Sequence, residues 1–188
     1  MKKERLVSDA ALKLFAKKGL DKTSIDEIAA KAGVAKGTIY YHYRSKEEIF
    51  LKLVDGIFAD FLEEIETKIK PEDPPKEKLE KVLEIQFAFF KKNRTQTRVL
   101  LSEFWQLPKV WERDLEKSNG FFAHLNGIIK EGQAEGSFRK EINTTSFAVL
   151  IFNLIAANGF ANETLENKVP AKEIENTFKI VILSGIEA

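Results

Sequence analysis

The stretch TSIDEIAAKAGVAKGTIYYHYRSKEEIF, residues 23–50, carries the strongest structural signals in this sequence. Ser24 is followed three residues later by Glu27, which is the capping-box pattern at the start of a helix. Apolar residues then recur at helical spacing until Gly33, which closes the helix where a left-handed backbone is easiest. A short helix over 34–41 follows. The stretch therefore predicts two short helices joined by a glycine turn.

Helical periodicity continues on both sides of this stretch, and no segment shows the sustained alternation typical of a strand. An apolar stripe that ends at Gly19 predicts a first helix. A second capping pattern, Ser45 with Glu48, opens a fourth helix whose stripe runs for about six turns. Prolines make 70–76 the clearest connector. Further helices are expected over 75–92, 95–107, 110–132, 145–165 and 170–185.

We therefore expect an all-α fold of about nine helices. Residues 1–46 would form a three-helix head, and residues 47–188 would form a helical body, with the long fourth helix joining the two. The charge is divided in the same way. The head holds 11 Lys or Arg against 5 Asp or Glu, a net of +6, whereas the body holds 19 against 24, a net of −5. This division favours a polyanionic partner for the head, although chance clustering of solvated lysines would also produce it.

The short helix after the turn has the residues that a nucleic-acid interface needs. In AKGTIYYHY, residues 35–43, Ile39 and Tyr43 are placed to anchor the helix, together with Val34. Lysine, hydroxyl and imidazole groups point outward and can bind phosphates or base edges, and Gly37 permits close approach. The outward residues are Lys36, Thr38, Tyr41 and His42. An ordinary core helix would account for Tyr40 and Tyr43, but not for three tyrosines and a histidine in consecutive places.

Residues 23–50 resemble the N-terminal motif of the tetracycline-repressor (TetR) family of regulators. A capped helix, a glycine turn, GTIYYHY and SKEE arrive in register over about a quarter of the chain. The resemblance implies a homodimer that binds a palindromic DNA operator and releases it when a small molecule enters the body. Two positions depart from the family pattern: Ala35 replaces a common hydroxyl residue, and Tyr43 replaces the more usual phenylalanine.

The resemblance also implies individual DNA contacts. Thr23, with Ser24 beside it, would hold a phosphate at the start of the second helix, and Lys46 would hold one at the start of the fourth. Bases would be contacted by Lys36, Gly37 and Thr38. The DNA backbone or bases would be contacted by Tyr40, Tyr41 and His42.

The body is rich in aromatic residues, because 13 of the 15 phenylalanines lie at or beyond Phe58. One interpretation is an aromatic-lined cavity for an apolar or aromatic effector, and the other is a solid core. Polar residues within apolar faces would orient a ligand or would simply be satisfied core groups. The candidate ligand residues are Phe61, Gln86, Phe90, Phe104, Trp105, Phe121, His124 and Asn153.

The helix expected over 145–165 is apolar on every side and must be covered on two faces. Together with the last helix it suits a four-helix interface between two subunits, which the family resemblance also implies. The alternative is a helix fully buried within a monomer. The candidate interface residues are Phe152, Ile174, Phe178, Val181 and Ile182.

Several function classes are disfavoured. The chain has no cysteine and two histidines, so we expect neither a metal site nor a cofactor. No phosphate-binding loop, zinc-protease motif or nucleophile elbow is present, so we expect no enzyme. The most apolar stretch, 147–161, is too short to cross a bilayer, and the start of the sequence is not a secretory signal, so we expect a cytoplasmic protein that does not enter membranes. The alternatives to a ligand-responsive repressor are an architectural nucleic-acid binder without ligand control and an enzyme with a basic head.

Overall fold

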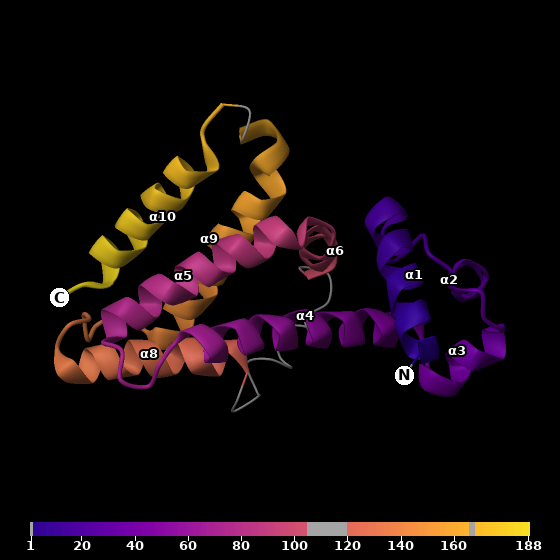
Figure 1. Cartoon of the computed structure of the whole chain (residues 1–188), viewed down its shortest axis with the longest axis horizontal. Helices are drawn as coiled ribbons and strands as arrows, with labels where there is room; N and C mark the ends of the chain where they lie inside the picture. The colour runs from indigo at the N-terminus through magenta and orange to yellow at the C-terminus, as the bar shows by residue number, and fades with distance from the viewer. Residues whose placement is uncertain (1, 105–119, 166–167) are drawn as a thin grey trace. The chain divides into compact units, whose positions relative to one another are not determined.

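The computed structural model describes residues 2–104, 120–165 and 168–188, and within these ranges the chain forms nine helices (Figure 1). The described residues contain a single isolated β-bridge, between Phe138 and Glu187. The predicted all-α fold is confirmed. The helices are α1 (Lys2–Lys18), α2 (Ile25–Ala32), α3 (Lys36–His42), α4 (Lys46–Lys68), α5 (Pro75–Lys92), α6 (Arg94–Phe104), α8 (Phe121–Glu135), α9 (Thr144–Leu165) and α10 (Ala171–Ile186).

The chain divides into two compact units. We call the first the head unit; it comprises Met1–Ile57 with Thr95–Trp111. The second, the body unit, comprises Phe58–Arg94 with Glu112–Ala188. α4 is one continuous helix that supplies its first half to the head unit and its second half to the body unit.

In the head unit, α1 packs against α2, and α2 packs against α3. The predicted stripe of α1 supplies buried side chains, and the ring of Phe15 meets the ring of Phe50 edge-on at 6.1 Å. Leu6, an apolar residue of the same helix, is 45% exposed. The buried core residues here include Val7, Ala11, Phe15, Ile28, Ile39, Ile49 and Phe50. These contacts fix α3 through Ile39, and so determine which of its residues face outward.

In the body unit, α5 contacts α8, α9 and α10, and α8 also contacts α9 (Figure 1). The bounds of α5 match the expected helix over 75–92, with Pro75 in its first turn, where a missing N–H is harmless. The segment 105–119, which contains the first part of the helix expected over 110–132, lies outside the described residues.

The end of α8 differs from the predicted end at Gly132. The helix continues to Glu135, and Gly136 provides the left-handed cap with φ of 82°. Gly132 is needed for another reason. A Cβ atom there would lie 2.1 Å from the ring of Phe138, which is buried. The glycine therefore reflects a packing contact made by the following loop, which the local pattern does not reveal.

Candidate functional site

The start of α2 is fixed by the predicted capping box. The Ser24 hydroxyl accepts a hydrogen bond from the Glu27 backbone N–H, and the Glu27 carboxylate accepts from the Ser24 backbone N–H at 2.9 Å. The hydrogen bond from the Lys18 ammonium, followed by those from the Ser24 N–H and hydroxyl, lowers the pKa of Glu27 to about 2. This carboxylate is therefore ionised at neutral pH and holds α1 and the start of α2 together.

The turn between α2 and α3 is made by Gly33, whose φ is 66°. Its N–H bonds back to the end of α2, as in a glycine helix cap. Ala35 precedes α3 in extended conformation and has no polar side chain to cap it. Because the turn uses residues 33–35, α3 covers Lys36–His42 rather than the predicted 34–41.

The outer surface of α3 has the exposed aromatic groups that the sequence predicted. Tyr41 is 84% exposed and Tyr40 is 53% exposed. A Cβ atom at Gly37 would meet nothing within 4 Å in the described chain, so packing does not explain the glycine. Thr38 is half-buried beside it. The helix therefore presents two tyrosines and an open stretch of backbone to solvent.

The two basic groups of α3 have acidic partners in this structure. The Lys36 ammonium lies 2.8 Å from an Asp26 carboxylate oxygen on α2, which raises the pKa of Lys36. His42 Nδ1 lies 3.6 Å from the Glu4 carboxylate, and its ring meets the ring of Tyr41 edge-on. A polyanion that binds this surface has to compete with Asp26 for the lysine, a pairing that the sequence pattern did not predict.

Thr23 and Lys46 are directed into the head unit. Thr23 is 2% exposed, and its hydroxyl donates to the carbonyl of Gly19 at 2.7 Å. The Lys46 ammonium donates to the carbonyls of Leu20 and Asp21 at 2.9 and 2.7 Å. Both side chains therefore hold the turn between α1 and α2. A phosphate contact from either would require these hydrogen bonds to break or to be shared.

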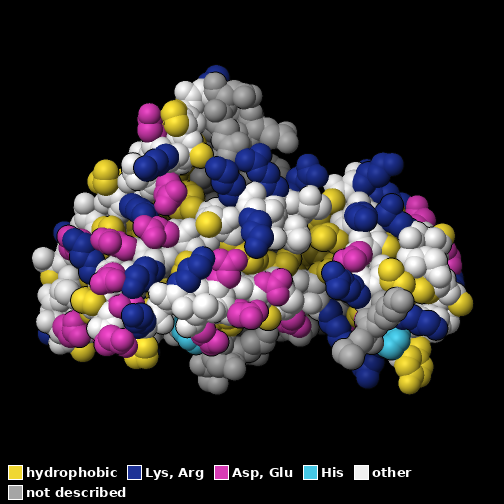
Figure 2. Space-filling view, viewed as in Figure 1, with side chains coloured by type: hydrophobic (Ala, Val, Ile, Leu, Met, Phe, Trp, Pro, Cys, Tyr) yellow, Lys and Arg dark blue, Asp and Glu magenta, His cyan; other side chains and the backbone are white. Residues whose placement is uncertain are grey.

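On the face shown in Figure 2, Lys and Arg side chains are visible over both units, whereas Asp and Glu side chains are more frequent over the body unit than over the head unit. The visible distribution agrees with the division of charge in the sequence. A positive head attracts a polyanion and an acidic body does not.

In the body unit, rings from four helices form an aromatic cluster. Three of the predicted ligand residues belong to it: Phe61 lies 5.1 Å from Phe121 and 6.4 Å from Phe90 between ring centroids. The remaining members, which the ligand prediction did not include, are Phe58, Phe89, Phe122 and Phe152. Their spacing of 5–7 Å is typical of favourable aromatic pairs.

The predicted polar ligand residues have different environments. Gln86 is fully buried next to the backbone of Phe152. The Asn153 amide donates to the Val149 carbonyl of its own helix at 2.8 Å and is therefore satisfied locally. Phe104 ends α6, but its side chain and the whole of Trp105 lie outside the described residues.

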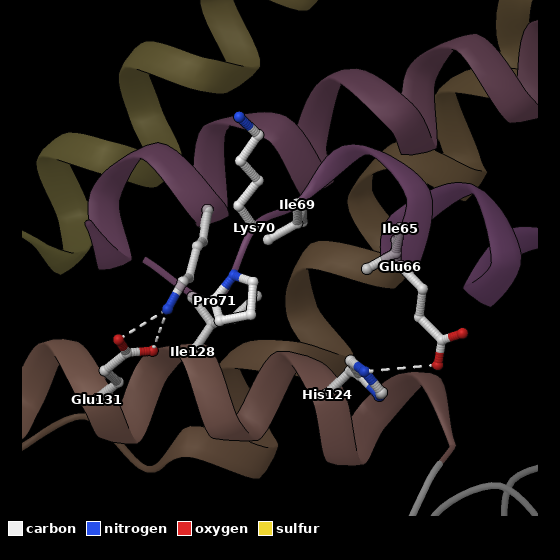
Figure 3. Close-up of a pocket in the computed structure, with 9 residues that line it drawn as sticks. Ile65, Glu66, Ile69, Lys70, Pro71, His124, Ile128 and Glu131 are labelled. Carbon is white, nitrogen blue, oxygen red and sulfur yellow. Dashed lines mark hydrogen bonds and ion pairs between the residues drawn. The ribbon is translucent and has the colours of Figure 1, made fainter. Parts of the chain in front are cut away.

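His124 lines a pocket of about 340 Å³ beside the C-terminal end of α4 and α8 (Figure 3). The pocket lining includes three apolar side chains, those of Ile65, Ile69 and Ile128. His124 Nε2 lies 3.9 Å from the Glu66 carboxylate. At the opposite side, Lys78 donates to both carboxylate oxygens of Glu131 at 2.7 and 2.8 Å (Figure 3). This ion pair, in which Lys78 is buried and Glu131 is half-buried, has no signal in the sequence, because its members are 53 residues apart.

The predicted interface residues lie on more than one side of α9 and α10. Phe152 is 1% exposed and belongs to the aromatic cluster, Ile174 and Ile182 are also buried, and Phe178 meets the ring of Phe87 at 5.5 Å. Val181 is 62% exposed. Among the side chains of these two helices that the structure describes, the exposed large apolar residues are Leu150, Leu154, Ile180 and Val181.

The head has two short helices around a glycine turn, the second of which exposes polar and aromatic groups, and it is followed by a separate helical body. This arrangement defines a helix-turn-helix transcriptional regulator. Residues 7–53 match the model of the bacterial regulatory proteins of the tetR family, and residues 55–182 match the YsiA-like protein C-terminal region. The chain belongs to the TetR family of transcriptional regulators.

Two named relatives are also transcriptional or metabolic regulators. The chain is 27% identical to a fatty acid metabolism regulator protein of Bacillus subtilis over 96% of this chain and 93% of that protein. It is 28% identical to the transcriptional repressor KstR2 of Mycolicibacterium smegmatis, over 94% and 86% respectively.

Solved structures are similar over nearly the whole chain. The regulator FadR from Bacillus subtilis, solved in complex with stearoyl-CoA, matches with a TM-score of 0.80 and 25% identity, over 97% of this chain and 99% of that one. A putative fatty acid metabolism regulator from Clostridium perfringens matches with a TM-score of 0.79 and 28% identity over the same shares.

Among the described helices, none is long and apolar enough to cross a membrane.

Proposed function

We propose that this regulator is a repressor that binds a palindromic DNA operator as a dimer and leaves it when an apolar ligand occupies the body. The exposed tyrosines on the outer surface of α3 are the main support for DNA binding. An 84% exposed tyrosine has no role in the core, and covering its ring with another molecule is favourable because it removes apolar surface from water. Tyr41 and Tyr40 would contact the DNA backbone or bases, and Gly37 would let the strand approach.

Lys36 and Thr38 would face the bases beside these tyrosines, and His42 would contact the DNA backbone or a base. Ser24, at the exposed N-terminus of α2, can receive a phosphate there, because the helix dipole favours an anion. Thr23 and Lys46 act indirectly in this proposal, by holding the α1–α2 turn through main-chain carbonyls.

The proposed dimer uses α9 and α10. Leu150 and Leu154 lie one turn apart on α9, and Ile180 and Val181 are neighbours on α10; all four are exposed. Two helices from each subunit would cover these residues, which gives the symmetric contact expected of a homodimer. Two heads related by a two-fold axis then require an operator with the same symmetry.

The proposed effector is a long acyl compound. The aromatic cluster offers an apolar lining, and the relatives include a fatty acid metabolism regulator and a structure bound to stearoyl-CoA. The continuous helix α4 would carry the response, because its body half includes Phe58 and Phe61 and its other half lies in the head unit. A ligand that moves these two rings would change the spacing of the recognition helices.

The test begins with selection of DNA fragments by the purified protein, followed by gel-shift titration of the selected site. Tyr41→Ala should weaken specific binding by about 1–3 kcal/mol, with a native circular dichroism spectrum. Tyr41→Phe keeps the ring and separates the part contributed by the hydroxyl. If Tyr41→Ala binds the selected site with wild-type affinity, Tyr41 of α3 does not contribute to specific DNA binding, and the proposed recognition surface is wrong. If stearoyl-CoA neither stabilises the protein nor displaces the DNA, the ligand-free architectural alternative is favoured.

A further inference from the structure

A buried amide in the body unit is incompletely hydrogen-bonded. Gln86 lies on α5, one helical turn before Phe90, and is 0% exposed. Its Nε2 lies 3.4 Å from the carbonyl oxygen of Phe152, a long contact for a hydrogen bond. Its Oε1 is buried and has no hydrogen-bond partner among the residues that the structure describes.

A buried acceptor without a donor destabilises a fold, because it has lost its hydrogen bonds to water. Methionine has nearly the same length and volume as glutamine and would fill this place without that loss. The glutamine is therefore not explained by packing. Asn153 shows the contrast, since its amide donates to a carbonyl of its own helix at 2.8 Å.

The position of Gln86 connects it with the aromatic cluster. The carbonyl beside its Nε2 belongs to Phe152, and the ring of Phe152 lies 5.9 Å from that of Phe90. An acceptor at this place in an apolar interior favours a ligand that brings a hydrogen-bond donor, because a ligand without one leaves the oxygen unsatisfied.

We infer that Gln86 is a specificity-determining residue of the body's ligand site, whose Oε1 accepts a hydrogen bond from an N–H or O–H group on a mainly apolar ligand. The inference rests on the proposed function, since it requires a ligand in the body. The donor has two chemical sources in an acyl ligand: a hydroxyl on the chain, or an amide N–H of the pantetheine arm when the acyl group is carried by coenzyme A.

The test compares probes with and without a donor by isothermal titration calorimetry. Stearate at neutral pH has no donor, stearoyl-CoA has pantetheine amides, and a panel of hydroxystearates places a hydroxyl at different carbons. Gln86→Met should lose about tenfold in affinity for at least one donor-bearing probe and keep its affinity for stearate within about twofold. The probe that loses affinity identifies the source of the donor. The melting temperature of ligand-free Gln86→Met should equal or exceed that of the wild type.

Asn126→Leu is the matched control, because Asn126 Oδ1 is the other buried acceptor without a partner in the described residues, and its amide contacts Thr145. This variant should bind every probe as the wild type does, and an equal loss would overturn the assignment to Gln86. Gln86→Leu repeats the experiment if the methionine variant does not fold.

The inference is also overturned if Gln86→Met binds all probes like the wild type, if it loses stearate equally, or if its melting temperature falls by several degrees. Failure of the proposed function looks different. In that case no probe binds the wild type, or bound stearoyl-CoA leaves the selected DNA in place. If stearoyl-CoA binds and releases DNA but Gln86→Met is indistinguishable from the wild type, only the inference fails.

Discussion

Gly132→Ala should destabilise the body unit, because the new methyl group would overlap the ring of Phe138. A Cβ atom built at residue 132 lies 2.1 Å from Phe138 Cδ2, whereas carbon atoms in contact are about 3.5–4.0 Å apart. The ring is 1% exposed, so it cannot yield without disturbing its neighbours. Overpacking of this kind costs about 1–3 kcal/mol, and expelling a phenylalanine costs about 3–5 kcal/mol.

The protein will take the less costly route, and the higher helix propensity of alanine offsets up to about 1 kcal/mol. After this offset we expect a net loss of about 0.5–2 kcal/mol, or a melting temperature lower by roughly 1–8 °C in thermal denaturation followed by circular dichroism. Gly127→Ala on the same helix is the matched control. A Cβ atom there meets nothing within 4 Å in the described chain, so this variant should be up to about 1 kcal/mol more stable than the wild type.

A double-mutant cycle identifies the cause. In a Phe138→Leu background the alanine should cost at least about 1 kcal/mol less, because the smaller side chain leaves room for the methyl group. Steric overlap with Phe138 is excluded if Gly132→Ala melts at or above the wild-type temperature, or if the alanine costs the same stability in both backgrounds.

Three further predictions concern the head unit and the subunit interface. Because the folded-state pKa of Glu27 is lowered to about 2 from its usual value of 4.5, its contribution to stability is present above pH 4.5 and is lost as the pH falls towards 2. Glu27→Gln should therefore show a smaller fall in stability over that range, and an unchanged pH profile would contradict the capping role. Lys46→Met should lower the stability of the head by roughly 1–2 kcal/mol in chemical denaturation, because two hydrogen bonds to main-chain carbonyls are lost. The dependence of DNA affinity on salt concentration should stay the same. If the slope of log affinity against log salt concentration falls by about one per subunit, the ammonium binds a phosphate instead. Val181→Glu should give monomers in light scattering, because it places charge in the proposed interface; a wild-type dimer mass in this variant would exclude that surface.

Much of the fold could be predicted because its signals are local. The Ser24–Glu27 capping box and the proline before α5 set helix starts that the structure reproduces. The end of α8 could not be predicted in this way. Gly132 resembles a helix terminator in sequence, yet a tertiary contact with Phe138 requires it, and the helix ends at Gly136.

The exposure of Lys36 and Tyr41 was likewise predictable, because Ile39 fixes the helix, whereas Thr38 and His42, which were also expected to point outward, are half-buried. The hydrogen bonds of Lys46 were not, since the carbonyls that it contacts are 25 and 26 residues away. On α10 the candidate interface residues cover about 100° of arc and lie across the edge of the buried surface, so that Ile182 points inward and Val181 outward. Periodicity shows that a helix has an apolar side, but the boundary of that side depends on its neighbours.

If the proposed function is right, a ligand in the body and DNA at the head weaken each other's binding, and thermodynamic linkage makes this directly testable. Stearoyl-CoA is titrated into the protein alone and into the protein saturated with its selected DNA site. We expect weaker stearoyl-CoA binding in the presence of DNA, by the same factor by which stearoyl-CoA weakens DNA binding. Equal affinity for stearoyl-CoA in both titrations would rule out the proposed coupling.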